Sequence, residues 1–203
     1  MKEVKRYSRA YAEIPARWLG QAGLTPNALT IIGSALTASV GLLIAQGWFL
    51  PAGVCLWLFS ATDTLDGALA RATGRVTLFG AFLDSVCDRY AEACVFFGLV
   101  WWYQSIGDAL GLALAYVALV GSLMVSYARA RAEGVGLQAA EVGWFQRPER
   151  IIALGLGLLA APLAPAALQV VLAVLAVLTT VTVLQRVIHV ARAAGYNQPH
   201  TTP

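Results

Sequence analysis

Four aspartates stand close together in an otherwise apolar part of the chain, within the stretch DTLDGALARATGRVTLFGAFLDSVCD. They are Asp63, Asp66, Asp84 and Asp88. A carboxylate at the centre of a membrane helix costs roughly 3 kcal/mol on insertion scales, so this group requires a compensating partner. The first pair is spaced i, i+3 and the second i, i+4, so on helices each pair shares one face. Two such faces brought together predict an all-oxygen site for hard divalent cations, Mg²⁺ or Mn²⁺.

The composition is that of a membrane protein. Of the 203 residues, 59% are hydrophobic and 12% are charged, and the mean hydropathy is +0.68. Soluble globular proteins carry about 25% charged residues, so that class is excluded. Cys55, Cys87 and Cys94 lie in apolar segments without a CxxC pair, which is typical of small buried residues rather than of a redox or zinc site.

Six apolar segments, each near the ~20 residues that a bilayer core requires, predict the elements that position the aspartates. We place these segments at about 27–46, 51–72, 79–104, 108–131, 148–163 and 165–190. No internal repeat or linker divides the chain, and residues 191–203 form a polar tail. The sequence therefore predicts an all-α integral membrane protein, with a single domain over residues 1–203 and a six-helix membrane bundle over about 27–190.

The N-terminal region has a different pattern. Residues 1–26 carry basic side chains and apolar residues at helical spacing, which predicts an amphipathic helix lying in the membrane interface. Residues 1–27 lack the short apolar core of a cleavable signal peptide. Thr25 and Pro26 form a helix-start signal, and for Thr25 and Asn27 we favour capping over ligand contact.

Lysine and arginine are confined to one set of connections. The loops after the first, third and fifth segments carry none, whereas the N-terminal region, the loops after the second and fourth segments and the C-terminal end carry many. By the positive-inside rule, both termini are cytoplasmic. The aspartates then lie at the inner ends of the second and third segments, so the candidate site faces the cytoplasm at the cell membrane.

Small residues accompany the carboxylates. Gly67, Ala70 and Gly80 lie on or beside the carboxylate faces, where they either let helices pack closely or leave a slot for a flat ligand. Packing explains Gly80 well, while Gly67, next to the acids near a helix end, is better explained by room for a ligand. Arg71, one turn beyond Gly67, is either an interface anchor or a phosphate ligand.

With its gaps, the stretch reads Asp63-x2-Asp66-Gly67-x2-Ala70-Arg71-x8-Gly80-x3-Asp84-x3-Asp88. At every specified position it resembles the signature of the CDP-alcohol phosphatidyltransferases, and the six segments and the N-terminal helix also resemble that family. The resemblance implies transfer of a phosphatidyl group from a CDP-linked lipid, CDP-diacylglycerol, to an alcohol, with release of CMP. It further implies two bound divalent cations, Mg²⁺ or Mn²⁺, membrane lipid as a partner and a homodimer; no nucleic-acid partner is expected.

The resemblance also implies roles for the carboxylates. Asp63, Asp66 and Asp84 chiefly hold metal, and Asp88 acts as general base and shared ligand. These roles fit the reaction, because cations that bridge the diphosphate oxygens neutralise the charge that repels a nucleophile and stabilise the leaving CMP phosphate. A carboxylate partly free of the metals can then take the proton of the acceptor hydroxyl.

The remaining signature residues belong, by the same resemblance, to the CDP-lipid. Gly67, Ala70 and Arg71 lie on the nucleotide and diphosphate side, and Thr77 touches the nucleotide. Glu92, one turn after Asp88, is outside the signature. It either pairs with a nearby arginine or tunes Asp88, and it is left out of the site.

Arginines further along the chain indicate the acceptor. The stretch SYARARAEGVGLQAAEVGWFQRPER brings Arg129, Arg131, Arg147 and Arg150 to the predicted cytoplasmic side, and Arg186 lies near the inner end of the last segment. Guanidinium groups match phosphate oxygens in pairs, so the cluster favours a phosphorylated alcohol over a neutral one. Anchoring at anionic headgroups explains some of these arginines in any case.

The arrangement YxRARAE…G(W)FxRPER resembles the bacterial phosphatidylinositol-phosphate synthases and their archaeal counterparts, which use inositol 1-phosphate. On that resemblance Arg129, Arg150 and Arg186 hold the acceptor phosphate, with Arg147 assigned to the same group. The chain departs from these relatives at Arg129, where they often have Lys, and in a longer, less glycine-rich link over residues 137–144.

Other interpretations remain open at this point. Glycerol 3-phosphate is an equally compatible acceptor, which would make phosphatidylglycerol phosphate, and a rarer alternative joins a soluble inositol phosphate to CDP-inositol. A divalent-cation transporter would also place acids inside the membrane. However, the outward halves of the segments are almost entirely apolar and the outer loops carry one charge, Asp108, which favours an enzyme open to the cytosol.

Overall fold

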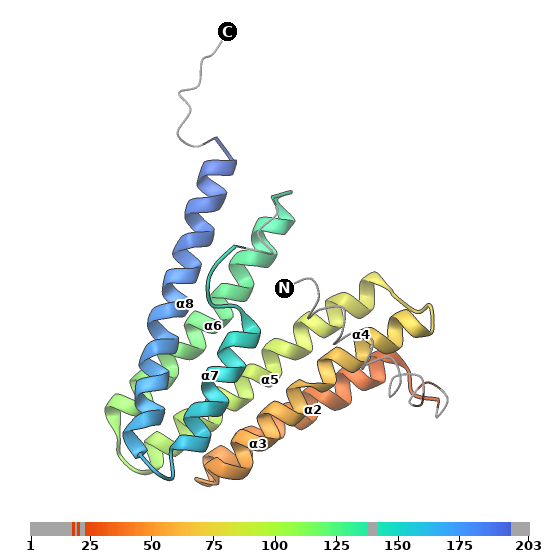
Figure 1. Ribbon diagram of the computed structural model, residues 1–203. Coiled ribbons are helices and arrows are strands. Elements are labelled where there is room, and N and C mark those ends of the chain that lie inside the picture. Colours follow the sequence, from red (N-terminus) through yellow and green to blue (C-terminus); the bar gives the residue numbers. More distant parts are fainter. Residues whose placement is uncertain (1–17, 19, 21–22, 138–141, 196–203) are drawn as a thin grey trace. The chain divides into compact units, whose positions relative to one another are not determined.

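The computed structural model describes residues 18, 20, 23–137 and 142–195, and its helices are shown in Figure 1. In these residues every regular element is a helix, so the all-α prediction is confirmed for them. The predicted interfacial helix at 1–26 lies almost wholly outside the described residues, as does most of the tail. Two compact units divide the chain, Met1–Trp102 and Tyr103–Pro203, and each is described by itself.

The first unit contains α2 (Pro26–Ala45), α3 (Phe49–Ser60), α4 (Thr62–Ala72) and most of α5 (Leu78–Ser105). The start of α2 confirms the predicted cap. The Thr25 hydroxyl oxygen accepts a hydrogen bond from the Ala28 N–H at 3.2 Å, and Pro26 begins the helix, where its missing N–H costs nothing.

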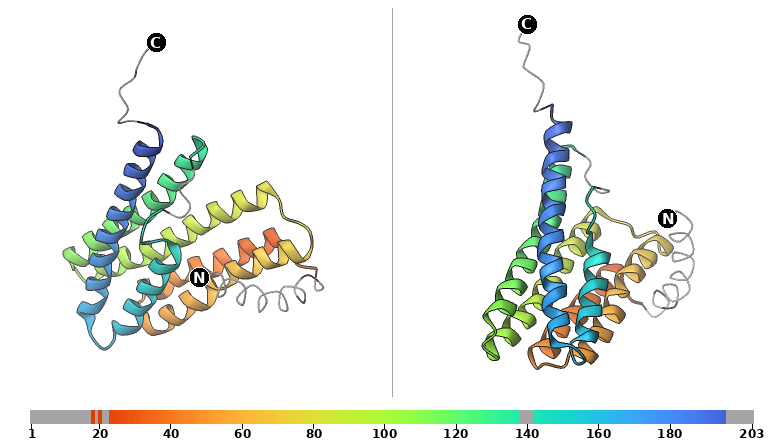
Figure 2. Two further views of the ribbon diagram at one scale, coloured as in Figure 1. Left: turned by 45° about the horizontal axis from the view of Figure 1, so that its top comes forward. Right: turned by 60° about the vertical axis from the view of Figure 1, so that its left-hand side comes forward.

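The second predicted segment, 51–72, is not one continuous helix. It is interrupted at Ala61, between α3 and α4. The Thr62 hydroxyl donates to the Phe59 carbonyl at 2.5 Å, and such a local side-chain bond competes with the regular helical ladder. Ala61 keeps right-handed helical dihedral angles (φ −69°, ψ −21°), so α4 continues directly from α3 (Figure 2).

Small residues allow α2 and α5 to cross at very close range. A Cβ atom added to Gly41 of α2 would collide with the Cys94 carbonyl of α5, and one added to Gly98 would collide with the Gly41 backbone. Glycine at such a crossing lets two backbones approach as no larger residue can. α2 also packs along α3 and α4, so the first turns of α2 and α5 come together with α4.

The second unit contains α6 (Ala109–Gly134), α7 (Arg147–Ala160) and α8 (Pro165–Ala193). α6 and α7 both pack on α8. Asp108, the single charge in the predicted outer loops, has a structural part here. One of its carboxylate oxygens caps α6 by accepting from the Gly111 N–H at 2.9 Å, and the other accepts from Gln169 of α8 at 2.5 Å.

Three of the described helices are long and apolar enough to cross a membrane: Pro26–Ala45, Ala109–Gly134 and Ala166–Ala193. α5 is long enough, but every 18-residue stretch of it holds Asp88, Arg89 and Glu92. α3 and α7, with 12 and 14 residues, are each shorter than the ~20 residues of a full span. Among the described residues, three of the six predicted membrane segments are therefore helices long and apolar enough to cross a membrane, by length and composition alone.

Candidate functional site

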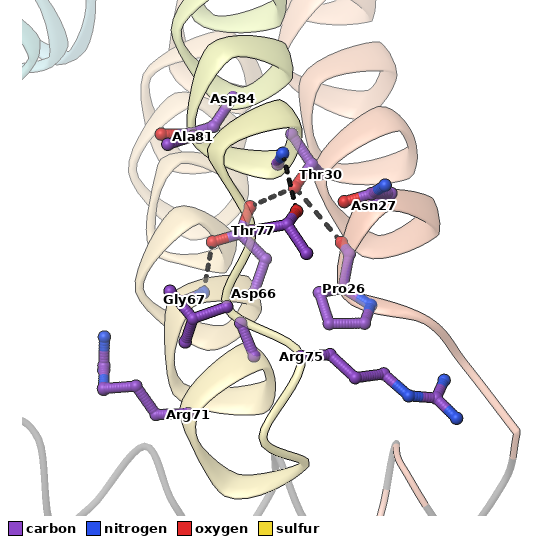
Figure 3. A pocket seen from close by; sticks show the side chains of 13 residues that line it. Pro26, Asn27, Thr30, Asp66, Gly67, Arg71, Arg75, Thr77, Ala81 and Asp84 are labelled. Atoms are coloured by element: carbon purple, nitrogen blue, oxygen red, sulfur yellow. Dashed lines mark hydrogen bonds between the residues drawn. The ribbon is translucent and has the colours of Figure 1, made fainter.

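A pocket of about 300 Å³ lies in the first unit, where α2, α4 and the first turns of α5 meet (Figure 3). α2 contributes residues from its N-terminal end, and α4 contributes residues from Asp66 to Arg71. The α4–α5 connection and the start of α5 form the remaining wall. The lining residues are Pro26, Asn27, Thr30, Asp66, Gly67, Ala70, Arg71, Arg75, Val76, Thr77, Gly80, Ala81 and Asp84.

Six residues of the predicted site line this one pocket. They are the carboxylate residues Asp66 and Asp84 together with Gly67, Ala70, Arg71 and Thr77. The pocket thus combines two acidic side chains with residues that were predicted for the nucleotide and diphosphate. Asp66 comes from α4 and Asp84 from α5, so hard oxygen donors reach the same cavity from two helices.

The Asp66 carboxylate is held by hydrogen bonds to both of its oxygens. Oδ2 accepts from the Thr30 hydroxyl at 2.6 Å, and Oδ1 accepts from the Gly67 N–H at 2.5 Å. The side chain is only 7% exposed. A buried carboxylate with two donors is fixed in orientation, because turning it would leave a buried polar group unsatisfied.

Thr30 is a site residue that the sequence prediction missed. Its hydroxyl lies 36 positions from Asp66 along the chain, and it also lies 3.1 Å from the Pro26 carbonyl oxygen of its own helix. A signal was present, since Asn27 and Thr30 are polar residues at i, i+3 on the first apolar segment. Asn27, for which we favoured capping, also lines the pocket.

The other two aspartates do not line the pocket. Asp63 lies half-buried in the first turn of α4. Asp88 is 6% exposed and lies 3.5 Å from the guanidinium of Arg89, measured from Oδ2 to Nη1. Among the described residues, no three His, Cys, Asp or Glu side chains converge as a ready metal-binding group.

The donor set nevertheless fits a hard divalent cation. All four predicted ligands are carboxylates, and Mg²⁺ and Mn²⁺ prefer oxygen donors. Asp66 and Asp84 already face one cavity, and like charges drawn together without a cation would repel one another.

Gly67 and Arg71 are close neighbours, as their spacing predicts. A Cβ atom added to Gly67 would lie 3.3 Å from Arg71 Nη1, so a larger residue there would press on the guanidinium. Arg75, in the connection between α4 and α5, also lines the pocket (Figure 3). The pocket lining therefore includes two arginines and two aspartates, the residue types that bind the anion and the cation of a metal-bound diphosphate.

Thr77 and Gly80 shape the start of α5. The Thr77 hydroxyl accepts a hydrogen bond from the Gly80 N–H at 2.9 Å, so Thr77 has a structural role as well as a place in the pocket. A Cβ atom on Gly80 would lie 3.0 Å from the Thr77 hydroxyl and 3.2 Å from Asn27 Oδ1. Gly80 is therefore closely packed against these two side chains, and it also lines the pocket.

In the second unit the structure brings three of the four acceptor arginines together. Arg150 is 3% exposed and Arg186 is 2% exposed, and both Arg150 and Arg129 are close enough to Arg186 to repel it electrostatically. Arg129 also pairs with Glu133 at 2.9 Å. Arg147, the first residue of α7, is not among the groups that act on Arg186.

Arg186 also makes bonds that the sequence did not predict. Its Nε donates to the Val142 carbonyl at 2.9 Å, and its Nη1 donates to the Val125 carbonyl. A guanidinium carries five N–H donors, so these two bonds leave others for a ligand. The sequence predicted Arg186 only as a ligand of the acceptor phosphate, not as a donor to backbone carbonyls.

Comparisons with known proteins agree with this picture. The family model described as CDP-alcohol phosphatidyltransferase matches residues 23–191. The phosphatidylinositol phosphate synthase of Mycobacterium marinum is 42% identical over 188 residues, which are 89% of this chain and 79% of that protein.

Two crystal structures of the Mycobacterium tuberculosis phosphatidylinositol phosphate synthase are similar to this chain, each at 36% identity. The one with CDP-DAG bound has a TM-score of 0.84 and covers 89% of this chain and 93% of that chain. The one in complex with manganese and citrate has a TM-score of 0.83 and covers 88% of both. With six of the eight signature residues at one pocket and the family model matching residues 23–191, the chain belongs to the CDP-alcohol phosphatidyltransferase family.

Proposed function

We propose that this protein transfers the phosphatidyl group of CDP-diacylglycerol to the hydroxyl of inositol 1-phosphate, which releases CMP and forms a phosphatidylinositol phosphate. The observation that carries the proposal is that six of the family's eight signature residues line one pocket, where Asp66 and Asp84 accompany Gly67, Ala70 and Arg71. The relative at 42% identity is named for this product, and the similar crystal structure holds CDP-DAG.

Asp63, Asp66, Asp84 and Asp88 hold two divalent cations, Mg²⁺ or Mn²⁺, in this proposal. Support comes from the all-oxygen donor set, from the two carboxylates that face one pocket, and from the manganese in the similar crystal structure. When bound, the cations neutralise the diphosphate and stabilise the leaving CMP phosphate.

The chain's own residues supply the remaining steps. Asp88 takes the proton from the acceptor hydroxyl, and the oxygen so formed attacks the lipid-side phosphorus. The bond between that phosphorus and the bridging oxygen breaks, and the oxygen leaves with CMP. Gly67 and Ala70 have small side chains that leave room for the nucleotide against the helix. Arg71 and Thr77 bind the nucleotide and diphosphate part of the CDP-lipid.

Arg129, Arg147, Arg150 and Arg186 bind the phosphate of the acceptor. Three of these guanidinium groups lie close together, and two of them are almost fully buried. Glu133 supplies one negative charge to this cluster, because it pairs with Arg129 and also attracts Arg186. A phosphate monoester carries the charge and geometry to bind several guanidinium groups at once. This electrostatic argument favours a phosphorylated acceptor over free inositol, glycerol or serine.

Replacing Arg150 with Ala is expected to raise the KM for inositol 1-phosphate roughly 100-fold, because hydrogen bonds to charged groups contribute about 1.5–3 kcal/mol each. The KM for CDP-diacylglycerol should change less than about twofold, since Arg150 lies on the acceptor side in this account. Steady-state kinetics with each substrate varied in turn makes the measurement. Arg131→Ala, which removes an exposed arginine near the end of α6, is the matched control. A loss of CDP-diacylglycerol affinity in Arg150→Ala would move Arg150 to the other substrate.

Replacing Thr30 with Val is expected to weaken Mn²⁺ binding roughly tenfold, because groups that orient a metal ligand typically contribute 10–100-fold to affinity. The change removes the 2.6 Å hydrogen bond to Asp66 and keeps the side-chain shape. Mn²⁺ titration followed by electron paramagnetic resonance measures the effect without turnover. Thr37→Val, at a buried threonine of the same helix, is the control. Equal Mn²⁺ affinity in Thr30→Val and wild type would show that Thr30 does not orient a metal ligand.

The membrane setting is also part of the proposal. The chain crosses the cell membrane six times, with both termini and the active site in the cytoplasm, and it assembles as a homodimer. α3 and α4 together count as one interrupted crossing, because 24 residues (49 to 72) make about 36 Å of helix. The one-sided distribution of Lys and Arg supports the orientation.

The acceptor is tested by supplying CDP-diacylglycerol with inositol 1-phosphate, free inositol, glycerol 3-phosphate or serine, and measuring the CMP released. Inositol 1-phosphate should give the highest kcat/KM. A higher kcat/KM with glycerol 3-phosphate would identify glycerol 3-phosphate as the acceptor, and the reaction class would be unchanged. No CMP release with any of the four would contradict the proposed transfer.

A further inference from the structure

The segment that leads into α7 is held by three side chains of α8. The Phe145 N–H donates to the Thr182 hydroxyl oxygen at 3.2 Å, and the Trp144 N–H donates to Gln185 Oε1 at 3.2 Å. One residue further along α8, Arg186 Nε donates to the Val142 carbonyl at 2.9 Å. Residues 142–145 are thus bonded to three positions on one stretch of α8.

Close packing at Gly143 shows how tightly this segment lies on α8. Gly143 has a φ of +107°, which side-chain-bearing residues rarely adopt. A Cβ atom there would collide with Thr182 Cγ2 and would lie 3.7 Å from Arg186 Nε. Thr182 itself is fully buried, at 0% exposure.

The first turn of α7 carries Pro148, which favours a helix start, but it lacks a side-chain cap. Its N-cap residue, Gln146, makes no side-chain capping bond. The bonds from α8 end at Phe145, immediately before this cap, and they serve in its place. Arg150, which is 3% exposed, follows within the first turn, so its position depends on where the segment 142–145 is held.

We propose that Thr182 and Gln185 are positioning residues for the acceptor: by holding residues 144 and 145 they set the place of Arg150 opposite Arg186. This inference rests on the proposed function, because it takes these arginines as ligands of the acceptor phosphate. Displacing a positioned binding group by about 1 Å can cost on the order of 100-fold in rate, so two neutral hydrogen bonds can have a measurable effect on the use of the acceptor.

Thr182→Val tests the inference, because it removes the hydroxyl and keeps the side-chain shape. We expect the KM for inositol 1-phosphate to rise roughly fivefold, the factor that a net hydrogen bond of about 1 kcal/mol predicts. The KM for CDP-diacylglycerol should stay within about twofold. Thr182→Ser keeps the hydroxyl and should restore the wild-type KM, and Thr182→Val with Gln185→Leu should raise it further.

Thr179→Val is the matched control. Thr179 is also fully buried on α8, but its hydroxyl donates to the Leu175 and Ala176 carbonyls of its own helix. This control should leave the KM for inositol 1-phosphate unchanged. An equal rise of that KM in Thr179→Val and Thr182→Val would overturn the inference.

Hydrogen exchange of the intact protein separates this inference from the proposed function. The peptide that covers residues 142–150 should exchange several-fold faster in Thr182→Val than in wild type, Thr182→Ser or Thr179→Val. If inositol 1-phosphate is not the acceptor, wild-type turnover fails with it, and the KM comparison uses whichever phosphorylated alcohol releases CMP. Unchanged exchange in Thr182→Val, or an unchanged KM for that acceptor, would overturn the inference even if the transfer itself is established.

Discussion

Replacing Asp88 with Asn is expected to lower kcat for CMP release about 1000-fold, within the 100- to 10,000-fold range of general acid–base catalysis. The amide keeps the size of the side chain and one oxygen donor, but it cannot take a proton from the acceptor hydroxyl. Asp88 is 6% exposed and lies beside Arg89, so bulk water cannot readily replace it as a base. Steady-state CMP release measures kcat, and titration with CDP-diacylglycerol shows whether substrate binding is kept.

The control for Asp88→Asn is Glu92→Gln, one turn further along α5. Glu92 lies outside the signature, so this change should alter kcat less than about twofold. Both variants remove one negative charge from the same helix, and only Asp88→Asn removes the proposed base. Retained turnover in Asp88→Asn, with metal and CDP-diacylglycerol bound normally, would refute the assignment.

Removal of divalent cations is expected to reduce CMP release at least about 1000-fold. The attacked phosphorus lies in a diphosphate, whose negative charge repels the nucleophile and must be neutralised. Arg71 and Arg75 line the same pocket, but each guanidinium carries only one positive charge and binds phosphate oxygens through hydrogen bonds, so it would neutralise less of the diphosphate charge than a divalent ion. The assay compares the protein in excess EDTA with the same sample after Mg²⁺ or Mn²⁺ is added back.

EDTA already saturated with Mg²⁺ is the control for effects of the chelator on the detergent or the protein. It should leave the rate unchanged. Mn²⁺ titration of the purified protein should reach two ions per chain, and Asp66→Ala should weaken that binding. Full CMP release in excess EDTA would rule out the carboxylates as a catalytic metal site.

The parts of the structure that could be predicted depend on residues that are close together in the sequence. Thr25 is a favourable N-cap residue and Pro26 a favourable first helical residue, and α2 begins at this point. The gaps between Asp66, Gly67 and Arg71 place them along one end of a helix, so their common pocket follows from helical geometry. The all-α class follows from the apolar segments.

The features that escaped prediction depend on partners from distant parts of the chain. The interruption at Ala61 involves the hydroxyl of Thr62, which bonds locally where α2 packs closely at Gly33. Thr30 reaches Asp66 across 36 positions. The polar pair Asn27 and Thr30 indicates a polar face on its helix, but it does not identify Asp66 as the partner. Arg186 bonds to carbonyls of two other segments, which a sequence pattern for phosphate ligands does not show.

Transfer of the phosphatidyl group itself is tested most directly by following the lipid-side phosphate of CDP-diacylglycerol. CDP-diacylglycerol labelled with ³²P in that phosphate is supplied with inositol 1-phosphate, Mg²⁺ and the purified protein, and the lipid and aqueous products are separated. We expect the label to stay in a new lipid that carries a second, unlabelled phosphate, and unlabelled CMP to appear in equal amount. Label in a water-soluble product, or no new lipid, would contradict phosphatidyl transfer.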